Sequence, residues 1–115
     1  MLESQIDLKA MIGENWGIFR EQMPEVAAAY DPLHQEAYKD GAISGKNKRL
    51  MALVGGLVRG CRGCILYQTE NALQLGATVE EILETITVAV SLGGTMAAGE
   101  SARVIAYLRE KGMLK

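Results

Sequence analysis

Histidine is almost missing from this sequence: His34 is the only one in 115 residues, and Phe and Trp also occur only once each. Histidine is the side chain that most readily moves protons near neutral pH, so acid–base catalysis has few candidates here. A structural zinc site needs four ligands, and one histidine with two cysteines falls short unless acids or a second subunit complete it. We therefore expect no metal centre.

Long hydrophobic runs and clusters of basic residues are lacking too. The longest mostly apolar run covers 50–58, far short of the ~20 residues that a membrane-spanning helix needs. The net charge is −2 and the basic residues are scattered, so no basic face is available for a phosphate backbone. The segment 1–7 is polar and acidic, unlike a signal peptide. These features predict a cytoplasmic protein that binds neither nucleic acid nor a membrane.

Small and flexible apolar residues are abundant instead. The chain holds 13 Gly and 6 Met, together with many Ala and Leu residues. Such a surplus indicates either apolar surface that is covered in an oligomer or simply a small, alanine-rich helical core, and both interpretations stay open. The length predicts a single domain over 1–115.

Apolar residues recur at helical spacing, and no stretch alternates long enough to predict a strand. We expect an all-α fold of about six helices with short connections, and a kink near Pro32 in the second. Ser44 and Thr78 are expected N-caps, and Thr78 with Glu81 forms a capping box. In the last helix we expect Ala98, Ala102, Ile105 and Leu108 to face inward. The expected helices are 5–21, 24–39, 45–59, 61–75, 79–92 and 95–111.

Both cysteines, Cys61 and Cys64, stand at C-x-x-C spacing where two helical patterns meet. In a chain without a secretion signal, this spacing favours redox or metal chemistry over a structural disulfide, although inert core thiols remain an alternative. Cys61 lies at a helix N-terminus, where the dipole and nearby Arg59 and Arg62 lower a thiol pKa. The spacing lets the two sulfurs meet. We expect Cys64 to be the more buried of the two.

Four segments together give a family resemblance. They are Lys-Arg-Leu-x-x-Leu at 48–53, Gly-Cys-x-x-Cys at 60–64, Ala-x-x-x-Gly-Ala-Thr-x-Glu-Glu-Ile at 72–82, and Gly-Gly at 93–94. The chain resembles the carboxymuconolactone decarboxylase or AhpD-like (alkylhydroperoxidase D-like) family over roughly 40–108. The resemblance implies a helical bundle that assembles as trimers or hexamers. It also implies thiol peroxidase or disulfide oxidoreductase chemistry, in which Cys64 attacks the substrate and Cys61 resolves the intermediate.

The sequence departs from that family where protons are relayed. The peroxidase branch has a Glu before the motif, a His beside the second cysteine and a His four residues after it. Arg49, Gly63 and Gln68 stand at these positions. Gln68 lies one helical turn beyond Cys64 and can hydrogen-bond a thiol or thiolate, but it cannot carry a proton. We expect Arg49, helped by Arg62, to stabilise the thiolate instead.

The missing base leaves His34 open to two interpretations. It is an ordinary surface or hydrogen-bonded histidine, or else either His34 or Glu36 folds over the cysteine corner and supplies the base. The sequence as a whole predicts a cytoplasmic homo-oligomeric oxidoreductase that uses Cys64, Cys61, Gln68 and Arg49. Its substrate would be a small peroxide or disulfide, with an external thiol reductant and no organic cofactor. Two alternatives remain: a decarboxylase acting on a small lactone acid, and a non-catalytic oligomeric scaffold.

Overall fold

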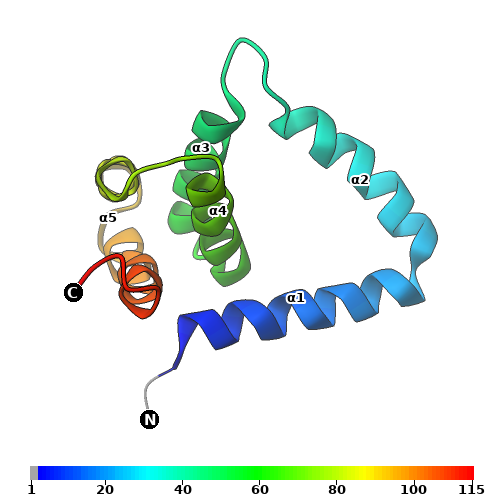
Figure 1. Cartoon of the computed structure of the whole chain (residues 1–115), viewed down its shortest axis with the longest axis horizontal. Coiled ribbons are helices and arrows are strands. Elements are labelled where there is room, and N and C mark those ends of the chain that lie inside the picture. The colour runs from blue at the N-terminus through cyan, green and yellow to red at the C-terminus, as the bar shows by residue number, and fades with distance from the viewer. Residues whose placement is uncertain (1–2) are drawn as a thin grey trace.

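The computed structural model describes residues 3–115, and this part of the chain is entirely helical (Figure 1). The predicted all-α fold is therefore confirmed. Residues 1 and 2, which begin the polar segment behind the prediction of no signal peptide, lie outside the described residues. The helices are α1 (Gln5–Gln22), α2 (Pro24–Tyr38), α3 (Gly45–Arg59), α4 (Arg62–Gln74) and α5 (Val79–Glu110).

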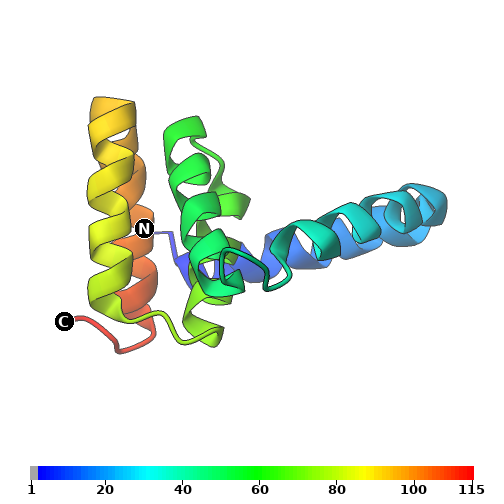
Figure 2. The same ribbon diagram turned by 90° about the horizontal axis from the view of Figure 1, so that it is seen from above.

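Helix α5 is interrupted at Gly94, which accounts for the difference between five elements and the six expected. Gly94 has φ 63° and ψ −142°, a backbone conformation that side-chain-bearing residues rarely adopt. The chain reverses there, so the two arms of α5 lie side by side (Figures 1 and 2). By length and composition alone, the 32 residues of Val79–Glu110 could cross a membrane. The reversal leaves each arm about half that length, shorter than the ~20 residues required.

The helices begin and end where local chemistry predicts. Ser44 accepts a hydrogen bond from Asn47 N, and Thr78 forms the expected capping box with Glu81. Gly60 closes α3 in the left-handed conformation, with φ 72°. The helix does not break at Pro32: α2 runs through it from Pro24 to Tyr38. Pro32 is exposed, so the carbonyl group that it leaves without a helical partner can be hydrated.

The core lies between α3, α4 and the two arms of α5. Its fully buried residues include Leu53 and Leu57 of α3, Ile65 of α4, and Ile82 and Leu108 of α5. Ile65, Leu66, Thr69 and Ala72 form the buried face of α4. The predicted inward face of the last helix is wrong in part. Ala98 and Ala102 are exposed there, because the arm is apolar on more than one side and its pattern does not fix the rotation. The buried residues of that arm are Ala97, Val104, Tyr107 and Leu108.

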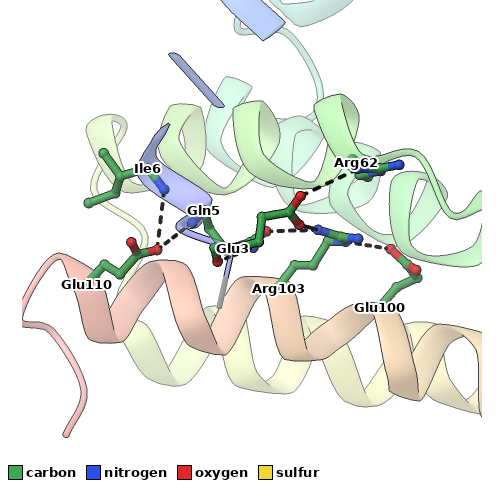
Figure 3. Close-up of polar contacts among 7 residues, drawn as sticks. All are labelled: Glu3, Gln5, Ile6, Arg62, Glu100, Arg103 and Glu110. Atoms are coloured by element: carbon green, nitrogen blue, oxygen red, sulfur yellow. Dashed lines mark hydrogen bonds and ion pairs between the residues drawn. The ribbon is translucent and has the colours of Figure 1, made fainter. Parts of the chain in front are cut away.

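The N-terminal end of α1 is fastened to the body by acidic side chains (Figure 3). Glu110, in the last turn of α5, accepts hydrogen bonds from Gln5 N at 2.7 Å and Ile6 N at 3.3 Å. These are backbone donors that a helix start leaves unpaired. Glu3 pairs with Arg103 of α5 at 2.8 Å and with Arg62 of α4 at 3.7 Å. The start of α1 is thus held across α4 and α5.

The rest of α1 and all of α2 project from this body as a helical arm (Figure 2). Helix α2 contributes no buried residue. A bidentate ion pair joins the two helices, with Arg20 donating to both carboxylate oxygens of Asp31 at 2.9 and 2.6 Å. The arm leaves many large apolar side chains exposed, among them Trp16, Ile18, Phe19, Met23, Val26, Tyr30 and Leu33.

Candidate active site at the cysteine pair

The two cysteines form a disulfide at the start of α4. Cys61 is the N-cap of that helix, in an extended conformation, and its Sγ accepts a hydrogen bond from Cys64 N at 3.2 Å. The Cα atoms of the pair are 5.2 Å apart. The expectation that C-x-x-C spacing brings both sulfurs to one helical corner is confirmed, and in the reduced state the same corner presents a helix N-terminus to a thiolate.

The relative burial of the two cysteines is the reverse of what we expected. Cys64 is exposed, whereas Cys61 is half-buried. The core-facing positions of this part of α4 are taken by Ile65, Leu66 and Thr69, which turns Cys64 away from the core. A reagent can therefore approach Cys64 without any rearrangement of the core.

The disulfide opens into a pocket of about 560 Å³ that four helices line. All four predicted site residues line it: Cys61 and Cys64 at the start of α4, Gln68 one turn further along α4, and Arg49 from α3. The other lining residues are Ile12, Gly13 and Trp16 of α1, Tyr30 and His34 of α2, and Gly63, Tyr67 and Asn71 of α4.

Arg49 is held at the pocket wall by two neighbours. Its Nη1 donates to Gln68 Oε1 at 3.1 Å, and its guanidinium carbon lies 3.8 Å from the ring centroid of Tyr38. Gln68, only 8% exposed, also donates from Nε2 to the Tyr38 hydroxyl at 3.3 Å. Gln68 thus positions Arg49, and in this state its amide engages Arg49 and Tyr38.

His34 lines the pocket, packed between two tyrosines of the same helix. Its ring lies 5.2 Å from that of Tyr30 and 4.9 Å from that of Tyr38. Burial lowers the pKa of His34, the charge of Arg49 lowers it further, and Asp31 opposes both. The imidazole is therefore neutral at pH 7 and able to accept a proton. Tyr30, His34 and Tyr38 recur every four residues, a one-face pattern that could have revealed this column.

Two other candidates lie elsewhere. Glu36 is exposed and pairs with Lys39 at 2.6 Å, outside the pocket. Arg62, the expected helper of Arg49, is exposed, pairs with Glu3 and does not line the pocket. Among the described residues that line the pocket, Arg49 is the one with a positive charge at neutral pH.

Some lining residues carried no signal in the sequence. Trp16 comes from the projecting arm, where helical spacing alone would place it against a core. Asn71 lies a turn beyond Gln68. Within residues 3–115, no group of three or more His, Cys, Asp or Glu side chains is arranged to hold a metal ion.

Comparisons with known proteins agree with this architecture. Residues 24–107 match the Carboxymuconolactone decarboxylase family. A family member from Legionella pneumophila with a solved structure is 32% identical and superposes with a TM-score of 0.88, covering 99% of this chain and 100% of its own. A family member from Thermotoga maritima, for which a role in the antioxidative response has been suggested, is 31% identical, with a TM-score of 0.70 over 75% of this chain and 89% of its own.

Two relatives known from sequence are uncharacterized proteins. One, from Cupriavidus necator, is 28% identical over 88% of this chain and 92% of its own length. The other, from the cox locus of Paracoccus denitrificans, is 32% identical over 71% of this chain and 74% of its own length. With the match over 24–107, these similarities establish that the chain belongs to the carboxymuconolactone decarboxylase family.

Proposed function

We propose that this protein is a thiol oxidoreductase that reduces a small peroxide or disulfide with its C-x-x-C pair. The observation that carries the proposal is the Cys61–Cys64 disulfide in the lining of a pocket, with Cys64 exposed. Inert structural thiols would instead be sealed in the core. The suggested antioxidative role of the Thermotoga maritima relative points the same way.

For a hydroperoxide, the reaction starts from the reduced pair. The Cys64 thiolate attacks the outer peroxide oxygen, the O–O bond breaks, and the alcohol leaves after taking up a proton. Cys64 is then a sulfenic acid. The Cys61 thiolate attacks its sulfur, which forms the disulfide and releases water. An external thiol reductant supplies two electrons and two protons to restore both thiols.

For a disulfide substrate, the same two cysteines act in the same order. The Cys64 thiolate attacks one sulfur and releases the first thiol as a leaving group. Cys61 then attacks Cys64 in the mixed disulfide and releases the second thiol. Both routes end in the oxidised pair that the structure contains.

The residues around the pair have separate tasks in this proposal. Arg49 supplies positive charge, and Gln68 positions Arg49 through its 3.1 Å hydrogen bond. His34, neutral at pH 7, takes the thiol proton and returns it to the leaving group, which is the task of the relay groups that the sequence lacks.

We also propose that the protein works in the cytoplasm as a homo-oligomer, a trimer or hexamer. Exposed apolar side chains on α3 and the first arm of α5 support the assembly, since monomers rarely leave such patches open. They include Met51 (58% exposed), Val88 (51%) and Leu92 (71%). No organic cofactor, nucleic acid or membrane is part of the proposal.

The test is reduction of the purified protein followed by addition of an organic hydroperoxide. We expect stoichiometric peroxide consumption and formation of the Cys61–Cys64 disulfide, detected by a mass loss of about two hydrogens on the intact chain. In Cys61→Ser, dimedone should trap a sulfenic acid on Cys64, whereas Cys64→Ser should consume no peroxide.

A disulfide substrate is tested in parallel with oxidised small-molecule dithiols. If the reduced protein reacts with neither substrate class faster than a free thiol does, the proposal fails. If a double Cys→Ser variant were as active as the unaltered protein, the activity would come from chemistry that does not use the thiols.

A further inference from the structure

We infer that the pocket at the cysteine pair is built for an anionic, aromatic substrate whose negative charge is received by Arg49. This inference rests on the proposed thiol chemistry and names its substrate class. It assigns Arg49 a role in substrate binding, beyond stabilising a thiolate.

The charge balance of the pocket is the first observation. Arg49 is half-buried, and no Asp or Glu is among the residues that line the pocket. Within residues 3–115, Arg49 makes no ion pair, whereas the guanidinium groups of Arg20 and Arg103 each pair with carboxylates. Partly withdrawing a cation from water without an anion beside it is unfavourable. A bound anion would supply the missing counter-charge.

The geometry of Arg49 is the second observation. A guanidinium group has five N–H donors, and Arg49 directs Nη1 to Gln68 while Tyr38 packs against its face. Its other nitrogens are not sealed in the protein, because no buried side-chain nitrogen or oxygen lacks a partner in the described part of the chain. Arg49 is therefore fixed in place with donors to spare. A carboxylate fits two parallel donors of such a group.

Part of the pocket wall is aromatic. Trp16 and Tyr30 line it from the projecting arm, with ring centroids 5.8 Å apart, and Tyr67 lines it from α4. Such rings stack on planar groups. A volume of about 560 Å³ lies in the range of pockets that bind small organic molecules.

Together these walls define the ligand. A planar ring lies against Trp16 and Tyr30, its acidic group meets Arg49, and its S–S or O–O bond faces Cys64. The reactions are those given above, with an aryl disulfide or aryl hydroperoxide that bears a carboxylate as the oxidant. It is reduced to two thiols, or to an alcohol and water, while the cysteine pair is oxidised.

The first experiment measures non-covalent binding to the oxidised protein, which needs no thiol reactivity. Trp16 is the only tryptophan, so its fluorescence reports on the pocket directly. We expect benzoate to bind at least about tenfold more tightly than benzamide, its neutral counterpart. Arg49→Gln should abolish this preference, and Arg49→Lys should keep part of it. Arg59→Gln, which removes an exposed charge of α3 outside the pocket, should leave it unchanged.

The second experiment uses the reduced protein with two aromatic disulfides. One is the dianion 5,5′-dithiobis(2-nitrobenzoate), and the other is the neutral 4,4′-dithiodipyridine. We expect Arg49→Gln to slow the reaction with the dianion at least about tenfold more than the reaction with the neutral probe. Both probes react with the same thiolate. The ratio of their two reaction rates in each variant is therefore independent of any change in the reactivity of the thiolate itself.

The outcomes separate the inference from the function beneath it. Equal slowing of both probes would assign Arg49 to the thiolate alone and overturn the inference, while the oxidoreductase proposal stands. Equal binding of benzoate and benzamide to the unaltered protein would also overturn it. Benzoate preference in a protein whose thiols do not react would uphold the anion site and remove the proposed chemistry.

Discussion

Gly56 of α3 lies directly against Cys64 of α4. A β-carbon added at Gly56 would come within 3.0 Å of the Cys64 Cβ and 3.2 Å of the backbone nitrogen of Ile65. The neighbouring Gly55 would meet nothing within 4 Å. Both glycines carry the usual cost of helix-interior glycine, but only Gly56 permits the close approach of α3 to the cysteine helix.

Gly56→Ala is therefore expected to destabilise the protein and Gly55→Ala to stabilise it. Gly56→Ala adds a methyl group, and the backbone of α4 must shift to make room for it, at a cost of about 1–3 kcal/mol. The second gains up to about 1 kcal/mol of helix propensity. Urea unfolding of both variants, at matched oligomer size, gives the comparison. Equal effects of the two substitutions would show that α3 and α4 do not pack this closely.

The pKa of His34 is expected to lie below the ordinary value of 6.5, because burial and the charge of Arg49 both disfavour the imidazolium. His34 is the only histidine, so its NMR titration is unambiguous. Arg49→Gln should raise the pKa of His34 towards the ordinary value, and Arg59→Gln should not change it. An unshifted histidine in the unaltered protein would place the Arg49 side chain elsewhere.

The same shift predicts how stability depends on pH. The folded state binds the His34 proton less readily than the unfolded state does. The free energy of unfolding therefore has its full value above pH 6.5 and falls as the pH drops towards the lowered pKa. His34→Gln should flatten this part of the profile. In peroxide assays it should also slow Cys64 oxidation by about 10²-fold near pH 7, at the lower end of what a general base contributes. Glu36→Gln, outside the pocket, is the control that should leave both measurements unchanged.

Glu110→Gln is expected to loosen the start of α1. The pKa of Glu110 is lowered, chiefly by the hydrogen bond from the Ser4 hydroxyl; desolvation opposes this shift, and the hydrogen bonds from Gln5 N and Ile6 N each add a smaller lowering. Its stabilising contribution is present above the ordinary value of 4.5 and is lost as the pH falls through the lowered pKa. The variant should lose about 0.5–1 kcal/mol at pH 7, in keeping with other helix N-caps, and its acid transition should be weaker where the lowered pKa of Glu110 makes the contribution titrate. Hydrogen exchange at Gln5 and Ile6 localises the effect.

Leu92→Glu is expected to dissociate the proposed homo-oligomer. Leu92 is 71% exposed on the first arm of α5, and a carboxylate there would need to be buried in the assembly. Sedimentation velocity should show a trimer or hexamer for the unaltered protein and smaller species for the variant. Lys115→Glu, at the exposed end of the chain, is the matched control. A monomeric unaltered protein at micromolar concentration would contradict the proposed assembly.

Local chemistry was enough to predict several elements. Ser44, Gly60, Thr78 and Gly94 mark boundaries because capping and positive-φ conformations depend on a few neighbouring residues. The meeting of Cys61 and Cys64 follows from their spacing at a helix start. The rotation of the last arm did not follow, since an alanine-rich helix presents several apolar faces and only packing selects one.

The sequence by itself determined most helix boundaries and the meeting of the two sulfurs, because each depends on residues that are close along the chain. It also indicated the family, through four motifs between residues 48 and 94. Only the tertiary structure decided what surrounds those sulfurs. Trp16, His34 and Arg49, from three different helices, line the same pocket as the cysteines, and which faces of separate helices meet depends on tertiary packing rather than on local spacing. It also decided that Arg62 turns towards Glu3 and that Cys64 faces outward, since both depend on which side of α4 the core occupies.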